Sequence, residues 1–364
     1  MMMMLCTCAQ ADIVYMTDDG DMGLVKLNGA LSSDLYGTQY TTSWSNPFLG
    51  SYWNGSSTRI ILVDRTTDTA ASGDTAYTFS PSDLTRPIET SRRVLAGMYS
   101  TQAFAGSDNG RAVFFASGNS IREYSTEDFS LTRSYTYKPK TSEDIDSEIA
   151  CLITGSNVIY ALVQQTNSCD VVLEFDGQLR DDVSSFRNWP LSHDTEGIAW
   201  LEGTRVAAWH DYGIDMRVNT GGFVRMLSTD VPVRAVCRDS GNGYYFIEQS
   251  ESEGIYTTEL KHYSSGKVST LYTNTEGQMC RLVRDGDNGI IGAIAGDVIL
   301  VCRMEDDILI GEYDGEMLGS FPVQLAVSHV TGSSKKDNSG CSLTLSGMGM
   351  MIFLAGVCAL RKRQ

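Results

Sequence analysis

The segment that decides the fold class runs from Val233 to Thr273 and reads VRAVCRDSGNGYYFIEQSESEGIYTTELKHYSSGKVSTLYT. It contains four runs of apolar or alternating residues, rich in Val, Ile, Tyr, Phe and Thr, and short turns of Gly, Asn, Ser and Glu separate them. Such runs are typical of β-strands. The segment therefore predicts a unit of four strands joined by tight turns.

The opening of this unit recurs along the chain. An apolar run, an acidic turn containing Asn-Gly and a second apolar run return in RLVRDGDNGIIGAI (Arg281 to Ile294) and in AFAGSDNGRAVFFA (Ala103 to Ala116). Asn-Gly favours a type I′ hairpin, because both residues tolerate positive φ. Looser copies cover Ala150 to Gln178 and Gly197 to Ser228, and STRIILVDR near Ser57 and DIVYMTDD at Asp12 supply core strands of two more.

The spacing of these units indicates the architecture. The second strand of each set is expected to start near residues 12, 57, 110, 157, 204, 243 and 289. A four-stranded unit of about 40 to 50 residues is the period of a β-propeller. We expect an all-β propeller over residues 12–327 with seven blades, six or eight being the alternatives. The turn pattern is similar to that of irregular propellers of the NHL type.

The two ends of the repeat predict how the ring closes. The first unit lacks an innermost strand before Asp12, and the run EMLGSFPVQLAV (Glu316 to Val327) is left over after the last full unit. Pairing of the late run with the first unit would explain both observations.

The charge balance excludes one class of partner. The chain has 28 Lys and Arg against 45 Asp and Glu, a net charge of −17. This sign repels phosphate backbones, so we expect no nucleic-acid partner.

Both ends of the chain predict export. In residues 1–11, Ala9 and Ala11 fit the small-x-small pattern of signal peptidase, which makes Asp12 the first mature residue. Residues 342–360 carry no charge and, at about 1.5 Å per helical residue, cover roughly 28 Å, close to the thickness of a bilayer. We therefore expect a transmembrane helix after a flexible linker at residues 328–340.

The last residues carry a resemblance. Gly340 and Cys341, the short apolar span and the basic end Arg361, Lys362 and Arg363 resemble the Cys-containing sorting tails of Synergistetes-type and myxobacterial-type proteins, which are related to rhombosortase substrates. The resemblance covers residues 338–364. It implies cleavage near Gly340 and Cys341 by a protease of rhomboid type and display on the surface of a diderm bacterium. The alternative is a plain membrane anchor at residues 341–364.

Cysteine usage does not define a site. The body contains an odd number of widely spaced cysteines without a CxxC pair, which indicates neither a disulfide framework nor a zinc site. In an oxidising envelope one or two bridges and buried free thiols are both compatible with the pattern. The five residues are Cys151, Cys169, Cys237, Cys280 and Cys302.

Two His-Asp steps are candidates for a ligand or metal site. His193 and Asp194, with Glu196 nearby, precede the fifth unit, and His210 and Asp211 follow its second strand. Both steps are expected at the same end of the blade. Histidine with carboxylates suits a divalent metal or general acid-base chemistry. The alternative is ordinary turn residues, because Asp is common in turns.

Acidic turns are candidates for calcium. Asp18, Asp19 and Asp21 form one group, and Asp285 and Asp287 form another. Carboxylate oxygens are calcium ligands, although neither group continues into a 12-residue loop that ends in Glu. The alternative is solvated turns, so no cofactor is expected beyond a possible Ca²⁺.

Tryptophan offers a further candidate surface. Five tryptophans are able to supply a stacking platform for sugars, and the alternative is packing in the core. They are Trp44, Trp53, Trp189, Trp200 and Trp209.

Together these features favour a binding module over an enzyme. The chain contains no GxSxG, HExxH, P-loop or dinucleotide-binding glycine turn. We expect a surface-displayed propeller that binds a protein or glycan. The alternatives are a hydrolase or lactonase with a metal at His193 and His210, and a membrane-tethered periplasmic assembly scaffold.

Overall fold

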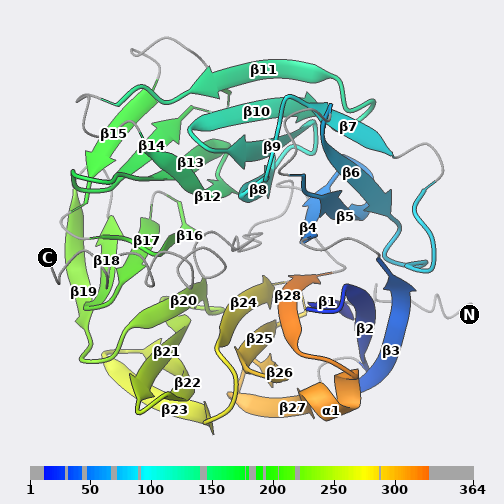
Figure 1. The fold of residues 1–364 in the computed structure, drawn as a ribbon. Coiled ribbons are helices and arrows are strands. Elements are labelled where there is room, and N and C mark those ends of the chain that lie inside the picture. Colours follow the sequence, from blue (N-terminus) through cyan, green and yellow to red (C-terminus); the bar gives the residue numbers. More distant parts are fainter. Residues whose placement is uncertain are drawn as a thin grey trace, which may run out of the picture.

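The computed structural model describes residues 12–327, apart from residues 29–31, 43–46, 67–71, 89–91, 140–145, 177, 180–185, 192–193, 204, 218–221 and 287. Seven four-stranded sheets stand around a common centre (Figure 1). Every strand pairs antiparallel with its neighbours within a blade. The chain therefore folds as a seven-bladed β-propeller, as the repeat predicts.

Blades are numbered by their order around the ring, and the strands within each run from the centre outward. Blade one has the order β28, β1, β2, β3, formed by β28 (Pro322–Val327), β1 (Asp12–Thr17), β2 (Asp21–Leu27) and β3 (Ser33–Thr41). Blade two contains β4 (Phe48–Trp53), β5 (Thr58–Asp64), β6 (Gly73–Phe79) and β7 (Arg93–Ala96). Blade three contains β8 (Ala103–Gly106), β9 (Ala112–Ser117), β10 (Ser120–Ser125) and β11 (Leu131–Thr136).

The remaining blades follow in chain order. Blade four contains β12 (Glu148–Gly155), β13 (Val158–Gln164), β14 (Val171–Phe175) and β15 (Phe186–Pro190). Blade five contains β16 (Gly197–Glu202), β17 (Arg205–His210), β18 (Gly213–Arg217) and β19 (Phe223–Ser228). Blade six contains β20 (Val233–Arg238), β21 (Tyr244–Ser252), β22 (Ile255–Ser264) and β23 (Lys267–Asn274). Blade seven contains β24 (Met279–Asp285), β25 (Ile290–Gly296), β26 (Val298–Arg303) and β27 (Ile308–Tyr313).

The predicted positions of the second strands are confirmed. These strands begin at Asp12, Thr58, Ala112, Val158, Arg205, Tyr244 and Ile290, each within two residues of its predicted start. The agreement follows from the burial pattern, because second strands are enclosed between neighbouring blades and read as continuous apolar runs. In β9, for example, Val113 to Ala116 are all buried.

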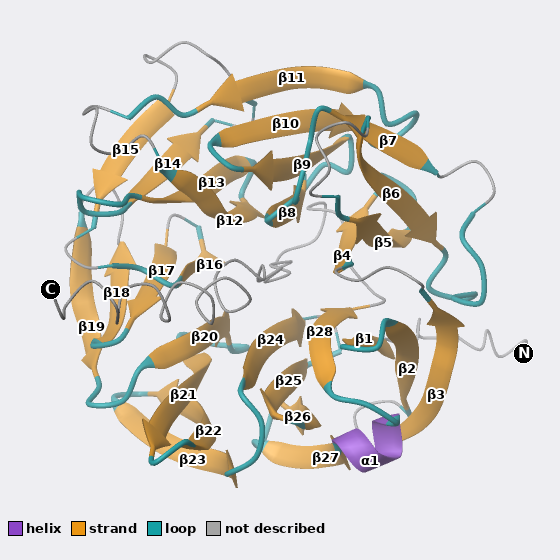
Figure 2. Ribbon diagram, in the orientation of Figure 1, coloured by secondary structure: helices purple, strands orange, loops and turns teal. Residues whose placement is uncertain are grey.

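Ring closure is confirmed, with one correction. Strand β28 pairs with β1, and Val14 lies opposite Ala326. Only Pro322–Val327 is strand, however, since Gly315–Leu318 forms the short helix α1 (Figure 2). The Asp314 side chain accepts a hydrogen bond from Met317 N, and Gly319 ends the helix at φ +82°, so local capping prevents extended structure there.

The Asn-Gly turn of blade six differs from the prediction. Neither Asn242 nor Gly243 has positive φ in the described structure, so the turn is not type I′. Asp239 builds it instead, by accepting hydrogen bonds from Gly241 N and Gly243 N at 2.7 and 3.0 Å. A Cβ at Gly243 would lie 2.2 Å from the Tyr263 carbonyl oxygen, so the close approach of the backbone requires glycine.

The core lies in the seams between blades. One apolar cluster joins Val14 and Met16 of blade one to Ile60 and Leu62 of blade two, and similar clusters join other neighbours. The outer strands are the most exposed, as in β19. Each blade buries its faces only against adjacent blades, as expected for a radial repeat.

Candidate functional site

Chain direction divides the ends of the strands into two faces. In antiparallel sheets successive turns lie at opposite ends. We call the upper face the one that carries the turns from second to third strands and the connections between blades. The lower face carries the turns from first to second and from third to fourth strands.

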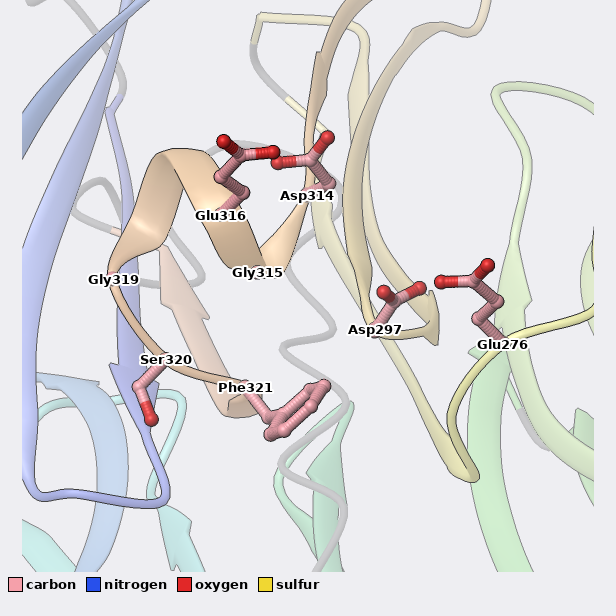
Figure 3. A pocket seen from close by; sticks show the side chains of 8 residues that line it. All are labelled: Glu276, Asp297, Asp314, Gly315, Glu316, Gly319, Ser320 and Phe321. Carbon is pink, nitrogen blue, oxygen red and sulfur yellow. The ribbon is translucent and has the colours of Figure 1, made fainter.

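An acidic pocket opens on the upper face where blade seven meets the closing segment. Its volume is about 450 Å³, and eight residues line it, of which four are acidic and none is basic. Figure 3 shows two pairs of carboxylates, Asp314 with Glu316 and Asp297 with Glu276. Phe321 lies at the pocket with 56% of its surface exposed. We call this site the seam pocket; Gly315, Gly319 and Ser320 complete its lining.

Ring closure builds one wall of the seam pocket. The segment from Asp314 to Phe321 connects β27 to β28 and contains α1. Its end is fixed to blade one, because Asp18 accepts hydrogen bonds from Ser320 Oγ and Phe321 N and donates its own N–H to Phe321 O at 2.9 Å. The wall is therefore held by the same contacts that close the ring.

The opposite wall comes from blade seven and the connection before it. Asp297 lies in the turn between β25 and β26, and Glu276 lies between β23 and β24. Asn274 Nδ2 donates to Asp297 Oδ1 at 2.8 Å and orients this carboxylate. Carboxylates grouped without a basic lining residue create a negative potential that attracts cations. An ammonium or guanidinium group has the charge that this pocket favours, and Phe321 offers it an aromatic ring.

The predicted rim of blade five is only partly assembled. Glu196 and Asp211 do come together on the upper face, as the spacing predicts. Both pair with the guanidinium of Arg234 in β20, and the distance from Arg234 Nη1 to Asp211 Oδ1 is 3.2 Å. Asp194 is exposed, and His193 lies outside the described residues. The cation at this rim is thus an arginine of the neighbouring blade.

His210 is buried, and its described contacts are with Tyr212 and Asp215. It is 1% exposed, its Nδ1 accepts a hydrogen bond from Tyr212 N at 3.0 Å, and its Nε2 lies 3.5 Å from Asp215 Oδ2. Asp215 also pairs with Arg225. The surroundings of His210 are those of a buried side chain that orders the end of β17 and the turn after it.

The two predicted calcium groups lie on opposite faces. The turn of Asp18 and Asp19 is on the upper face, and Asp285 is on the lower face. Asp21 accepts from Thr41 Oγ1 at 2.6 Å, and Asp285 accepts from the N and Nδ2 atoms of Asn288. These carboxylates act as acceptors that shape turns, and Asp19 is exposed. Asp287 lies outside the described residues.

Within the described ranges no group of three or more His, Cys, Asp or Glu side chains is arranged to hold a metal ion. The five body cysteines are free thiols, of which Cys169 is exposed. Burial raises the pKa of Cys151, Cys280 and Cys302 to about 12. Four of the five are thus buried side chains of the core.

The four tryptophans that the structure describes do not form an exposed platform. Trp200 and Trp209 are buried, and Trp189 packs against the Arg217 guanidinium at 4.5 Å from its ring. Trp53 is half-buried, and Trp44 lies outside the described residues. Among the described tryptophans, packing within and between blades is therefore the main role.

Sequence reasoning missed the seam pocket. Glu276, Asp297, Asp314 and Glu316 are spread over three connections, and each reads as an ordinary turn residue. The run from Glu316 to Val327 was the sequence feature that could have indicated this pocket. The segment that closes the ring must cross one face of the molecule, so a site is able to form beside it.

Several terminal predictions fall on residues that the structure does not describe. They concern Ala9, Ala11, Gly340, Cys341, Arg361, Lys362 and Arg363 and the apolar span 342–360. Among the described residues, no helix has the length and apolar character needed to cross a membrane.

Comparison with known proteins supports the fold. No protein-family model matches the chain, and no curated protein matches it in sequence. A crystal structure of a candidate 6-phosphogluconolactonase from Bacteroides fragilis is 11% identical, has a TM-score of 0.61 and covers 88% of this chain and 99% of its own. A similarly described structure from Bacteroides uniformis is 11% identical, with a TM-score of 0.59 over 87% of this chain and 99% of its own. At this identity the likeness shows a shared fold alone.

Proposed function

We propose that this chain is an exported, surface-displayed propeller that binds a basic segment of a protein partner in its seam pocket. The observation that carries the proposal is the pocket itself, with four carboxylates, no basic lining residue and an exposed Phe321. A lysine or arginine side chain supplies both the charge for the carboxylates and a cation for the aromatic ring.

The path of the chain is compatible with display. Ile13 pairs with Val327, so the first and last described strands reach the lower face side by side. Val327, the last described residue, therefore lies on the face opposite to the seam pocket.

The lactonase alternative draws on the names of the two similar structures, which share only the fold with this chain at 11% identity. A phosphorylated sugar substrate, which those names imply for those proteins, is an anion, so it would need a site other than the seam pocket. His210, the described histidine of the proposed metal rim, is buried beside Asp215. We therefore favour binding over hydrolysis.

Neutralising two pocket carboxylates should weaken binding of a basic probe. The variant Glu276→Gln/Glu316→Gln changes two exposed side chains, and each exposed ion pair is worth about 0.2–1 kcal/mol. Isothermal titration with a tri-lysine peptide should therefore show a Kd about two- to thirtyfold weaker than for the unmodified chain. The difference should shrink in high salt, because ions screen exposed pairs.

A matched control separates pocket binding from overall charge. Glu127→Gln/Glu305→Gln removes the same charge from exposed turns on the lower face. This control should bind tri-lysine like the unmodified chain. Equal losses in both double variants would show that only the net charge matters and would refute the pocket.

The display proposal has a separate test. Intact mass and fractionation of the protein from its native host should show loss of the residues after about Gly340 or Cys341 and recovery at the cell surface. A chain that keeps Arg361, Lys362 and Arg363 in the inner membrane would refute sorting and favour the periplasmic scaffold.

A further inference from the structure

A histidine between two carboxylates joins blades six and seven at the lower face. His262 lies in β22, and its Nδ1 is 2.8 Å from Asp307 Oδ2 of the turn between β26 and β27. Its Nε2 is 3.2 Å from Asp239 Oδ2 in its own blade. The ring stacks on Tyr245 with centroids 4.2 Å apart. Both nitrogens of one imidazole therefore face carboxylate oxygens.

Asp307 is held to blade six through both oxygens. Its Oδ1 accepts a hydrogen bond from Tyr245 Oη at 2.7 Å, while its Oδ2 faces His262. The residue adopts φ +59°, a left-handed conformation that is uncommon outside glycine. The surrounding contacts thus hold this turn in a conformation that aims the carboxylate across the seam.

The protonation state of His262 decides how many hydrogen bonds its imidazole can donate. A neutral imidazole has one N–H, so it donates to one of the two carboxylates and turns a lone pair toward the other. The imidazolium has two N–H groups and donates to both. With both carboxylates ionised, the observed geometry is therefore satisfied in full only when His262 is protonated.

The surrounding charges favour this cation. Burial by itself would lower the pKa of His262, but the hydrogen bonds and charges of Asp239 and Asp307 outweigh it and raise the pKa above its usual value of 6.5. Burial would raise the pKa of Asp239, but contacts with His262, Gly241 and Gly243 outweigh it and lower the pKa.

Tyr245 is a further titratable group in contact with the cluster. Burial, followed by its hydrogen bond to Asp307, raises its pKa, so it remains a neutral donor. Cys302 also lies near the cluster, and burial, followed by the charge of Asp307, raises the pKa of its thiol to about 12, so it stays neutral.

We propose that Asp239, His262 and Asp307 form a pH-sensitive latch that locks blade six to blade seven when His262 is protonated and releases the seam when it loses its proton. The cluster combines two acceptors on opposite sides of one ring with a partner on the adjacent blade. It is independent of the seam pocket, which lies on the other face.

The sign of the effect follows from linkage. The pKa of His262 is raised on folding, so its contribution is fully present below pH 6.5 and is lost as the pH rises through the folded value. The pKa of Asp239 is lowered, so its contribution is present above pH 3.8 and is lost as the pH falls through the folded value. The latch is therefore strongest between about pH 4 and 6.5.

Titration of the unmodified full chain tests the protonation state directly. Nuclear magnetic resonance of the imidazole signals, with His262 assigned from its absence in His262→Gln, should give a midpoint above 6.5. A midpoint at or below 6.5 would overturn the proposal, whatever the stability of any variant.

Hydrogen exchange tests the latch between the blades. Protection of β22 and β27, corrected for the intrinsic rate, should fall by up to about tenfold for each pH unit between 6.5 and the midpoint of His262, and it should level off above that midpoint. Asp307→Asn should weaken this pH dependence, because only Asp239 then presents a carboxylate to the imidazole. Asp306→Asn is the matched control, because Asp306 is the exposed neighbour that pairs with Arg303. Equal pH profiles for Asp307→Asn and the unmodified chain would overturn the latch.

Discussion

A chain that ends at Phe321 is expected to lose its cooperative unfolding transition. Strand β28 buries Leu325, Ala326 and Val327, and full burial of a Leu or Val side chain contributes about 1.5–3 kcal/mol. With the hydrogen bonds of the strand pair at about 1 kcal/mol each, roughly 5–8 kcal/mol is lost. Total stabilities are about 5–15 kcal/mol, so this loss is comparable to the whole.

The loss also reaches the neighbouring blade. Gln324 accepts a hydrogen bond from Leu49 N and donates from Nε2 to Pro47 O at 2.8 Å, so β28 fixes the start of blade two. Thermal unfolding followed by circular dichroism measures the effect. A second chain that ends at Val327 lacks the same tail and keeps β28, so it should melt cooperatively. A sharp transition in the chain that ends at Phe321 would contradict closure by β28.

Replacement of Asp74 by alanine is expected to destabilise the propeller by roughly 3–5 kcal/mol, because each buried donor left without a partner costs about 1–3 kcal/mol. Asp74 is fully buried in β6, and its carboxylate receives four hydrogen bonds. Oδ1 accepts from Thr66 N at 2.7 Å and from Ser100 N at 3.2 Å. Oδ2 accepts from Thr101 N at 2.7 Å and from Thr101 Oγ1 at 2.6 Å.

Urea unfolding of Asp74→Ala measures this cost as a lower midpoint at an unchanged slope. Asp128→Ala is the matched control, because Asp128 also accepts hydrogen bonds from a backbone N–H and a hydroxyl, both of Ser130, but is exposed. The control should unfold close to the unmodified chain. Identical midpoints for the two variants would show that the buried carboxylate does not hold the connection between blades two and three.

A buried aspartate accepts hydrogen bonds from neighbouring connections in blade four as well. Asp170 is buried before β14 and accepts hydrogen bonds from Gln165 N and Thr195 N at 2.9 and 2.6 Å. Burial, partly offset by these hydrogen bonds, raises the pKa of Asp170 to about 6. Carboxylates at the upper ends of third strands thus fasten the connections between blades, which explains part of the acidity of the chain without a metal.

The amino-acid sequence was sufficient for the architecture because that architecture is repetitive and local. Second strands enclosed on both faces read as apolar runs, their spacing equals one blade, and the unpaired run at the end predicts closure. Details of turns were less predictable. The conformation of the Asn242-Gly243 turn is set by hydrogen bonds to Asp239 and by the close approach of the Tyr263 backbone. Turn propensities do not include these contacts.

The candidate sites depended on the tertiary structure, because they combine residues from different blades. His193 and His210 were conspicuous in the sequence, yet His210 is buried beside Asp215. Asp307 and His262, which are 45 residues apart, meet only after blades six and seven pack. The sequence alone therefore determined a closed propeller, with seven as the favoured number of blades, through periodic burial. Tertiary packing decided which charges meet, because contacts across a seam depend on the register of two separate sheets and not on the local pattern of either.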